Sequence, residues 1–282
     1  MQEYLTPLSL FIILYSFPGT GGQSPCPDPE AIIPCVCSHN ETLATVTVDC
    51  SEATSSEEIF SAFNDADWPI LNLTSFWLER NDRVEQLPEG VFGDVTFQEI
   101  EVSRTSVESI DPEALLPSKD RLERLDINNS KLKEFPFEII AQFSILTYLS
   151  LGANELTSLS SFQSSSLETL GVAGNQLTFF GNMSLPNLRS FLMSFSSHLN
   201  LHLRKNEIAV VNEESFRPIL EVISNVTGNI DLTDNPVVCN CTMAWIVLNP
   251  AFLTKVTGSC TDGTDFQDLD PIDFQNCVDR IP

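Results

Sequence analysis

A short pattern in the middle of the chain repeats and decides the fold. Residues 146–159 read LTYLSLGANELTSL, and residues 167–180 read LETLGVAGNQLTFF. In the first copy Leu149 and Leu151 alternate with polar or small residues, as in a short strand with one buried face. Asn154 follows, and its side chain can both donate to and accept from backbone groups where the chain turns. The pattern therefore predicts a strand followed by a tight turn.

The pattern extends upstream through most of the first half of the chain. Further copies begin at Leu73, Phe97 and Leu122, with Thr105 and Ser130 in place of the asparagine in two of them. Successive copies up to the one at residue 167 start 24, 25, 24 and 21 residues apart. Such a period predicts a solenoid in which each turn buries its apolar residues against the next turn.

Downstream the spacing becomes irregular. One copy begins at Leu188, and a second match begins only ten residues later at His198. A complete turn does not fit in ten residues, so we expect a truncated turn or bulge near residues 195–199. This irregularity is either simple decay of the repeat or a binding feature on the exposed face. The last copy contains Ile230, Leu232 and Asn235.

Eight cysteines flank the repeats in two groups of four: Cys26, Cys35, Cys37, Cys50, Cys239, Cys241, Cys260 and Cys277. Even, grouped cysteines favour disulfides in an oxidising compartment, and spacing alone allows three pairings in each group. Zinc binding by the cysteines is the alternative interpretation.

Cysteine groups at both ends of a leucine-rich solenoid resemble the caps of extracellular leucine-rich-repeat proteins. The resemblance implies an α/β fold with short parallel strands on a concave face and irregular or short helical segments on the convex side. It also implies four pairs: Cys26–Cys37, Cys35–Cys50, Cys239–Cys260 and Cys241–Cys277. The expected order is a signal peptide (1–22), an N-terminal cap (23–72), the repeats (73–235), and a C-terminal cap and tail (236–282).

Charge and targeting signals indicate a secreted, extracellular protein. The chain has 39 Asp and Glu against 14 Lys and Arg, a formal charge of −25, which argues against nucleic acid or an anionic membrane as partner. The apolar run at residues 5–17 predicts a signal peptide and is too short to span a bilayer comfortably. Six N-glycosylation sequons support the same route: Asn40, Asn72, Asn128, Asn182, Asn225 and Asn240.

The sequence contains no convergent set of catalytic groups. His39, His198 and His202 have no nucleophile or carboxylate at an informative spacing, and the cysteines are assigned to the caps. We therefore expect no catalytic activity, no cofactor and no metal site. Five aspartates near the C-terminus form a solvated loop or, as the alternative, bind calcium: Asp262, Asp265, Asp268, Asp270 and Asp273.

The outward positions of the predicted strands are the candidate partner-binding surface. They are charged in the first repeats and small, neutral or apolar in the later ones, which resembles the composition of protein interfaces. The candidate residues are Trp77, Tyr148, Ser150, Thr169, Gly171 and Leu192.

Three stretches narrow the resemblance further: residues 26–37 (CPDPEAIIPCVC), 87–93 (LPEGVFG) and 215–221 (SFRPILE). They resemble the non-catalytic leucine-rich-repeat subunits of luciferin monooxygenases and related secreted arthropod proteins. The resemblance implies a secreted accessory protein whose partner is a small catalytic luciferase subunit. The alternative is a free-standing extracellular recognition protein in adhesion or innate defence.

Overall fold

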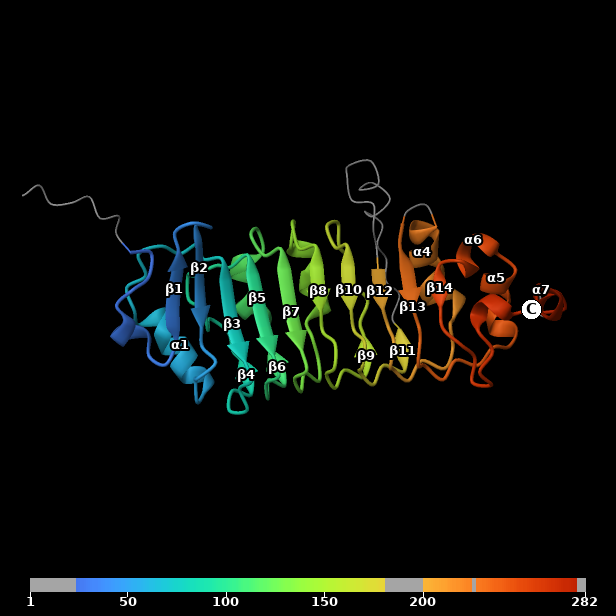
Figure 1. Ribbon diagram of the computed structural model, residues 1–282, viewed down its shortest axis with the longest axis horizontal. Helices are drawn as coiled ribbons and strands as arrows, with labels where there is room; N and C mark the ends of the chain where they lie inside the picture. Colours follow the sequence, from blue (N-terminus) through green and yellow to red (C-terminus); the bar gives the residue numbers. More distant parts are fainter. Residues whose placement is uncertain (1–23, 181–199, 225–226, 278–282) are drawn as a thin grey trace, which may run out of the picture.

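One long sheet runs through the molecule. The computed structural model describes residues 24–180, 200–224 and 227–277. Its ten strands stand side by side along the length of the protein (Figure 1). In spatial order they are β1 (Val36–Asn40), β2 (Thr45–Asp49), β3 (Ser75–Glu79), β5 (Glu99–Ser103), β7 (Arg124–Asn128), β8 (Tyr148–Ser150), β10 (Thr169–Gly171), β12 (Asn200–His202), β13 (Asn229–Asp231) and β14 (Val256–Thr257). All neighbours are parallel except β1 and β2.

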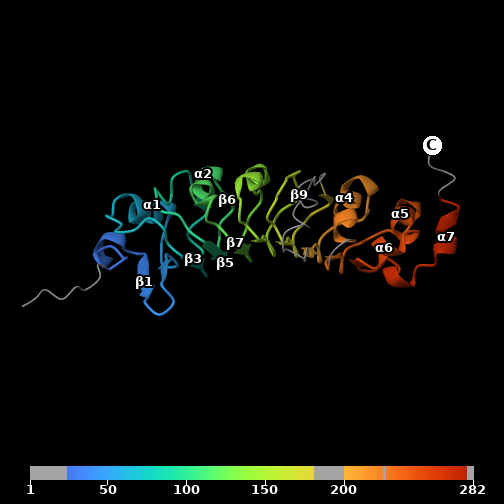
Figure 2. The same cartoon turned by 90° about the horizontal axis from the view of Figure 1, so that it is seen from above.

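The opposite, convex side is built from short pieces. Figure 2 shows helices α1, α2 and α4 on the side of the molecule away from β3, β5 and β7. The convex segments are α1 (Ser56–Asn64), α2 (Pro112–Leu115), the 3₁₀ turns η2 (Leu116–Ser118) and η3 (Phe137–Gln142), and α4 (Glu213–Ile223). Two small parallel pairs edge this side: β4 (Gln86–Leu87) with β6 (Ser109–Ile110), and β9 (Ser158–Leu159) with β11 (Phe179–Phe180).

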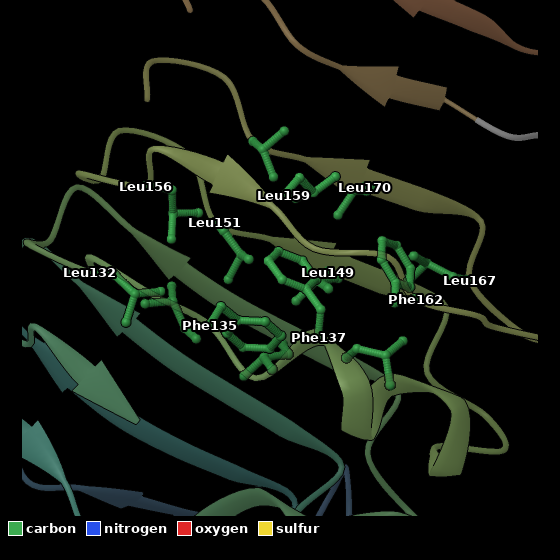
Figure 3. Packing of buried hydrophobic residues seen from close by; sticks show 14 of the residues in the cluster. Leu132, Phe135, Phe137, Leu149, Leu151, Leu156, Leu159, Phe162, Leu167 and Leu170 are labelled. Carbon is green, nitrogen blue, oxygen red and sulfur yellow. The ribbon is translucent and has the colours of Figure 1, made fainter. Parts of the chain in front are cut away.

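The core lies between the strands and these convex segments. Figure 3 shows Leu149 and Leu170 of the strands clustered with Phe137 and Phe162, which come from the outer side of the turns that precede them. All four side chains are buried. Each strand contributes its alternate residues to this core, as the repeat predicts.

The asparagines that follow the strands at the same place of the repeat pattern, here called slot residues, form a ladder of hydrogen bonds through the turns. Asn154 Nδ2 donates to Ile127 O of the preceding repeat (2.7 Å) and to Leu151 O of its own (3.0 Å), and Leu132 N donates to Asn154 Oδ1 (3.2 Å). Asn175, Asn206 and Asn235 make the equivalent bonds. Each asparagine therefore joins two successive turns. Thr105 and Ser130 interrupt this pattern and instead bond to each other at 2.8 Å.

Strand pairing shows which of the two overlapping repeat copies near residue 190 continues the main sheet. β10 pairs directly with β12, with Leu170 opposite Leu201. Asn206 also bonds back to Val172 O (3.1 Å), the position that precedes it by one turn. The match that begins at His198 therefore supplies the strand next to β10. The signal peptide, the copy at Leu188 and the predicted bulge at 195–199 lie outside the described residues.

Four disulfides hold the two ends. They join Cys26–Cys37, Cys35–Cys50, Cys239–Cys260 and Cys241–Cys277, the pairs that the family resemblance implies. All eight cysteines are therefore oxidised, which leaves no thiolate to bind zinc.

The N-terminal end consists of the β1–β2 hairpin, the 3₁₀ turn η1 (Pro29–Ile32) and α1, and β2 extends the main sheet. The C-terminal end contains η4 (Cys241–Met243), α5 (Ala244–Val247), α6 (Pro250–Leu253), η5 (Phe266–Asp268) and α7 (Pro271–Gln275). Arg217 of α4 lies over the rings of Trp245 (5.4 Å) and Phe252 (5.7 Å), which attaches this end to the last repeats.

Candidate protein-binding face

Four of the predicted contact residues lie together on the concave face. Tyr148 and Ser150 of β8 stand opposite Thr169 and Gly171 of β10 in the parallel register. We call these four residues the central face. Leu192 lies outside the described residues, and Trp77 lies on β3, with β5 and β7 between it and β8.

Ser150 is less accessible than its outward position suggests. It is only 8% exposed, and its Oγ donates to Asn128 Oδ1 at 3.0 Å. A β-carbon at Gly171 would approach Ser150 Oγ to 3.1 Å, so the small residue at 171 accommodates that hydroxyl. Ser150 therefore exposes little surface to a partner, because strands of a parallel sheet lie only about 4.8 Å apart. Its role as a contact residue stays a prediction.

A polar network rigidifies the edge of the central face. Arg124 lies over the Tyr148 ring, 3.6 Å from its centroid, and pairs with Asp126 at 2.6 Å. Asn128 Nδ2 donates to the same carboxylate, and Gly152 N donates to Asn128 Oδ1 at 2.6 Å. Burial raises the pKa of Asp126, and the Arg124 guanidinium partly offsets that rise. Tyr148 therefore offers a partner a ring already covered on one face.

A second surface surrounds Trp77, whose side chain is 39% exposed. In the sheet register Asp49 of β2 and Glu101 of β5 flank it. Glu79 lies two residues after Trp77 on β3, and Glu99 lies two residues before Glu101 on β5. We call these five residues the Trp77 surface. Burial, together with the carboxylates of Glu79 and Asp126, raises the pKa of Glu101.

The remaining titratable groups do not converge on a site. His202 lies half-buried on the concave side of β12, His39 is exposed on β1, and His198 is outside the described residues. Within residues 24–180, 200–224 and 227–277, no group of three or more His, Cys, Asp or Glu residues could hold a metal ion.

Three of the five C-terminal aspartates have structural partners instead. Asp262, Asp265 and Asp270 accept backbone N–H donors two residues ahead, from Thr264, Gln267 and Ile272. They therefore cap short turns and helices.

The sequons have different surroundings. Asn40, Asn72 and Asn240 are exposed, whereas Asn128 is half-buried in the network beside Ser150. Asn182 and Asn225 lie outside the described residues. Glycan occupancy at each position remains a prediction.

Residues 120–177 match the family model described as "Leucine rich repeat". The chain has the fold of a leucine-rich-repeat solenoid. It is similar to the Oplophorus-luciferin 2-monooxygenase non-catalytic subunit of Oplophorus gracilirostris, at 25% identity over 321 residues that cover 88% of this chain and 87% of that one. Among solved structures it matches human 5T4 (Wnt-activated inhibitory factor 1, trophoblast glycoprotein), with TM-score 0.46, 18% identity, and coverage of 84% of this chain and 97% of that one.

The structure adds residues to the concave face of this solenoid that the sequence patterns did not indicate. Asp49 belongs to the Trp77 surface because β2 joins the sheet in parallel with β3. The alternation of Val46 and Val48 in Thr45–Asp49 is the signal that could have revealed this extra strand. Asn128 was assigned as a sequon alone, and its bonds to the next repeat had no sequence signal.

Proposed function

We propose that this chain is a secreted, non-catalytic protein that binds another protein through its concave face. The observation that carries the proposal is its end-to-end similarity to a protein named as a non-catalytic subunit, since the match covers 88% of this chain and 87% of that one. The finer form of the proposal is an accessory or stabilising subunit of a luciferin monooxygenase complex, with a small catalytic chain as its partner.

The physical features of the chain support a binding role. The sheet presents an open face of strands on which small, uncharged side chains adjoin the fixed Arg124–Tyr148 pair. Disulfides at both ends are typical of proteins from oxidising compartments. No helix among the described residues is long and apolar enough to cross a membrane.

The test is purification of the tagged full chain from its native source under mild conditions, followed by mass spectrometry of bound proteins. We expect a separate, smaller catalytic chain that oxidises luciferin. A bound microbial or cell-surface ligand without any catalytic chain would favour the free-standing recognition protein instead. Turnover by the purified chain alone would contradict the non-catalytic assignment.

A matched pair of variants locates the contact. Thr169 lies half-buried on the central face, and Thr178 is exposed outside the main sheet, after β10. Thr169→Lys should weaken partner binding because the longer charged side chain stands on the proposed interface, and Thr178→Lys should not. Equal binding by both variants would remove the central face from the contact.

A further inference from the structure

An exposed tryptophan on the concave face lies among carboxylates that form no ion pair within the described part of the chain. Among the described residues, Trp77 of β3 and Val36 of β1 are the strand residues of the main sheet that count as large exposed hydrophobics, and Val36 stands opposite Asp49. Asp49 and Glu101 flank it on the neighbouring strands. Within the described residues, none of Asp49, Glu79, Glu99 and Glu101 forms an ion pair with Lys or Arg.

The hydrogen bonds that Asp49 and Glu99 accept come from neutral donors. Asp49 Oδ1 accepts from Ser51 N at 2.9 Å, and Glu99 Oε2 accepts from Ser75 Oγ at 3.4 Å. Such bonds leave the negative charge of the group in place. Arg124 stands opposite Glu99 and its charge partly offsets the raised pKa of Glu101, but it forms its ion pair with Asp126. The surface therefore combines an accessible indole face with an excess of negative charge.

Elsewhere on the same face, an arginine binds an aromatic ring and a carboxylate together. Two strands away from Trp77, Arg124 lies 3.6 Å from the centroid of the Tyr148 ring and 2.6 Å from Asp126. There, one guanidinium satisfies an aromatic face and a carboxylate together, which is the pairing that guanidinium geometry favours. At Trp77 the aromatic ring and the carboxylates are present, and no guanidinium of the described residues lies over the ring.

We propose that the Trp77 surface docks an arginine-rich segment of a protein partner, with one guanidinium stacked on the indole and paired with Glu101 or Asp49. The proposal rests on the protein-binding function proposed above and adds the chemistry of the partner. Charge complementarity selects this occupant, because a chain of net charge −25 repels a second copy of itself and attracts a basic segment. Arginine is favoured over lysine because its planar group stacks on the ring while it donates to a carboxylate.

The first measurement uses a fluorescent nona-arginine peptide as the probe and the intact secreted chain, at about 0.15 M salt so that long-range attraction is screened. The site variant is Glu79→Gln with Glu101→Gln. The control variant is Glu113→Gln with Glu138→Gln, two exposed glutamates of α2 and η3 that change the net charge equally. We expect the site variant to weaken binding about tenfold and the control less than about twofold. Equal losses would show general charge attraction and would overturn the proposal.

A second series tests the ring. Trp77→Ala should weaken nona-arginine binding by about three- to tenfold, and Trp77→Phe should restore part of the loss because it keeps an aromatic face. Nona-lysine should bind wild type more weakly than nona-arginine and lose less in Trp77→Ala. Unchanged nona-arginine binding by a folded Trp77→Ala protein, with folding checked by thermal unfolding, would overturn the proposal.

The native partner separates this proposal from the broader one. A partner that binds wild type and the Glu79→Gln, Glu101→Gln variant equally would overturn the role of the Trp77 surface and leave the proposed function standing. Absence of any co-purifying protein would count against the proposed function, and the peptide measurements would still decide whether the surface recognises arginine.

Discussion

Asn154 shows how one side chain connects two turns of the solenoid. Its carboxamide pairs with Ile127 O, Leu151 O and Leu132 N, which are all buried. Asn154→Ala would leave these groups without partners, so we expect it to lower the free energy of unfolding by about 3 kcal/mol. Chemical denaturation of the secreted protein measures the loss.

The matched control for Asn154 lies one repeat further on. Gln176 is exposed, directly after the slot residue Asn175. Gln176→Ala should change the free energy of unfolding by less than about 0.5 kcal/mol. A loss for Asn154→Ala no larger than that of the control would contradict the structural role of the ladder.

Ionised Glu101 lowers the stability of the folded state, and this effect depends on pH. Its pKa is raised by burial and by Glu79 and Asp126, so the folded state holds its proton more tightly than the unfolded chain does. Ionised Glu101 therefore destabilises the fold at pH 7, and this cost disappears as the pH falls through the raised pKa toward the ordinary value. Glu101→Gln should raise the unfolding temperature at pH 7 and lose that advantage in acid.

Glu108 provides the control with the opposite sign. Its hydrogen bond and charge interaction with Lys133 lower its pKa, so ionised Glu108 favours the folded state. Glu108→Gln should lower the unfolding temperature slightly at pH 7, and the difference should vanish as the pH falls through the lowered pKa. Shifts of the same sign in both variants, followed by thermal unfolding across pH, would contradict this assignment.

The residue before each slot could not be predicted from its type. Arg80, Arg104, Ala153 and Lys205 all have φ between 51° and 56°, in the left-handed region that most side chains avoid. Gly174, Asn129 and Asp234 occupy the equivalent place with residue types that adopt this region more readily. The strand and the asparagine on either side impose this conformation, and no shared chemistry marks it in the sequence.

Helix α1 closes the first repeats with an aromatic cluster. Phe63 is 4% exposed, stacks on Trp68 at 5.3 Å, and meets the rings of Phe92 and Phe97 edge-on at 5.3 and 5.8 Å. Phe63→Ala should lower the free energy of unfolding by about 3–5 kcal/mol, because it removes a buried ring and leaves a cavity.

The same helix supplies the control. Phe60 is one turn before Phe63 and 40% exposed, so Phe60→Ala should cost less than about 1 kcal/mol. Denaturation of the two variants side by side separates ring burial from helix propensity, which changes equally in both. A similar loss in both would show that α1 does not pack as described.

At the level of strands and turns, the sequence predicts which side chains of a strand are buried, but it does not predict which segments pair with each other. The alternation around Leu149 predicts the buried face correctly, because strand periodicity depends only on neighbours in sequence. The choice between the copies at Leu188 and at His198 depended on which one pairs with β10, and spacing could not decide it. The burial of Ser150 likewise comes from Asn128, which lies 22 residues earlier.

The whole molecule is an elongated polyanion. A solenoid keeps its charges apart along its length, and each turn contacts only its neighbours. Arg124 with Asp126 and Lys133 with Glu108 neutralise charge locally. Acids still exceed bases by 25, so repulsion within the folded chain persists. This excess also makes a basic partner surface the natural complement of the protein.

Salt should therefore stabilise the isolated protein. From about 10 mM to about 1 M NaCl the screening length falls from roughly 30 Å to about 3 Å, which removes most of the repulsion between carboxylates. We expect the unfolding temperature to rise, by about 2–4 °C for each kcal/mol gained.

The control replaces Asp262, Asp265, Asp268 and Asp270 by Asn, which preserves the capping oxygens of Asp262, Asp265 and Asp270 while removing four charges. Its unfolding temperature should rise less steeply with salt, because less repulsion remains to be screened. An equal dependence of the unfolding temperature on salt in both proteins would mean that salt acts through apolar burial. It would also mean that repulsion within the net charge of −25 does not measurably destabilise the folded state.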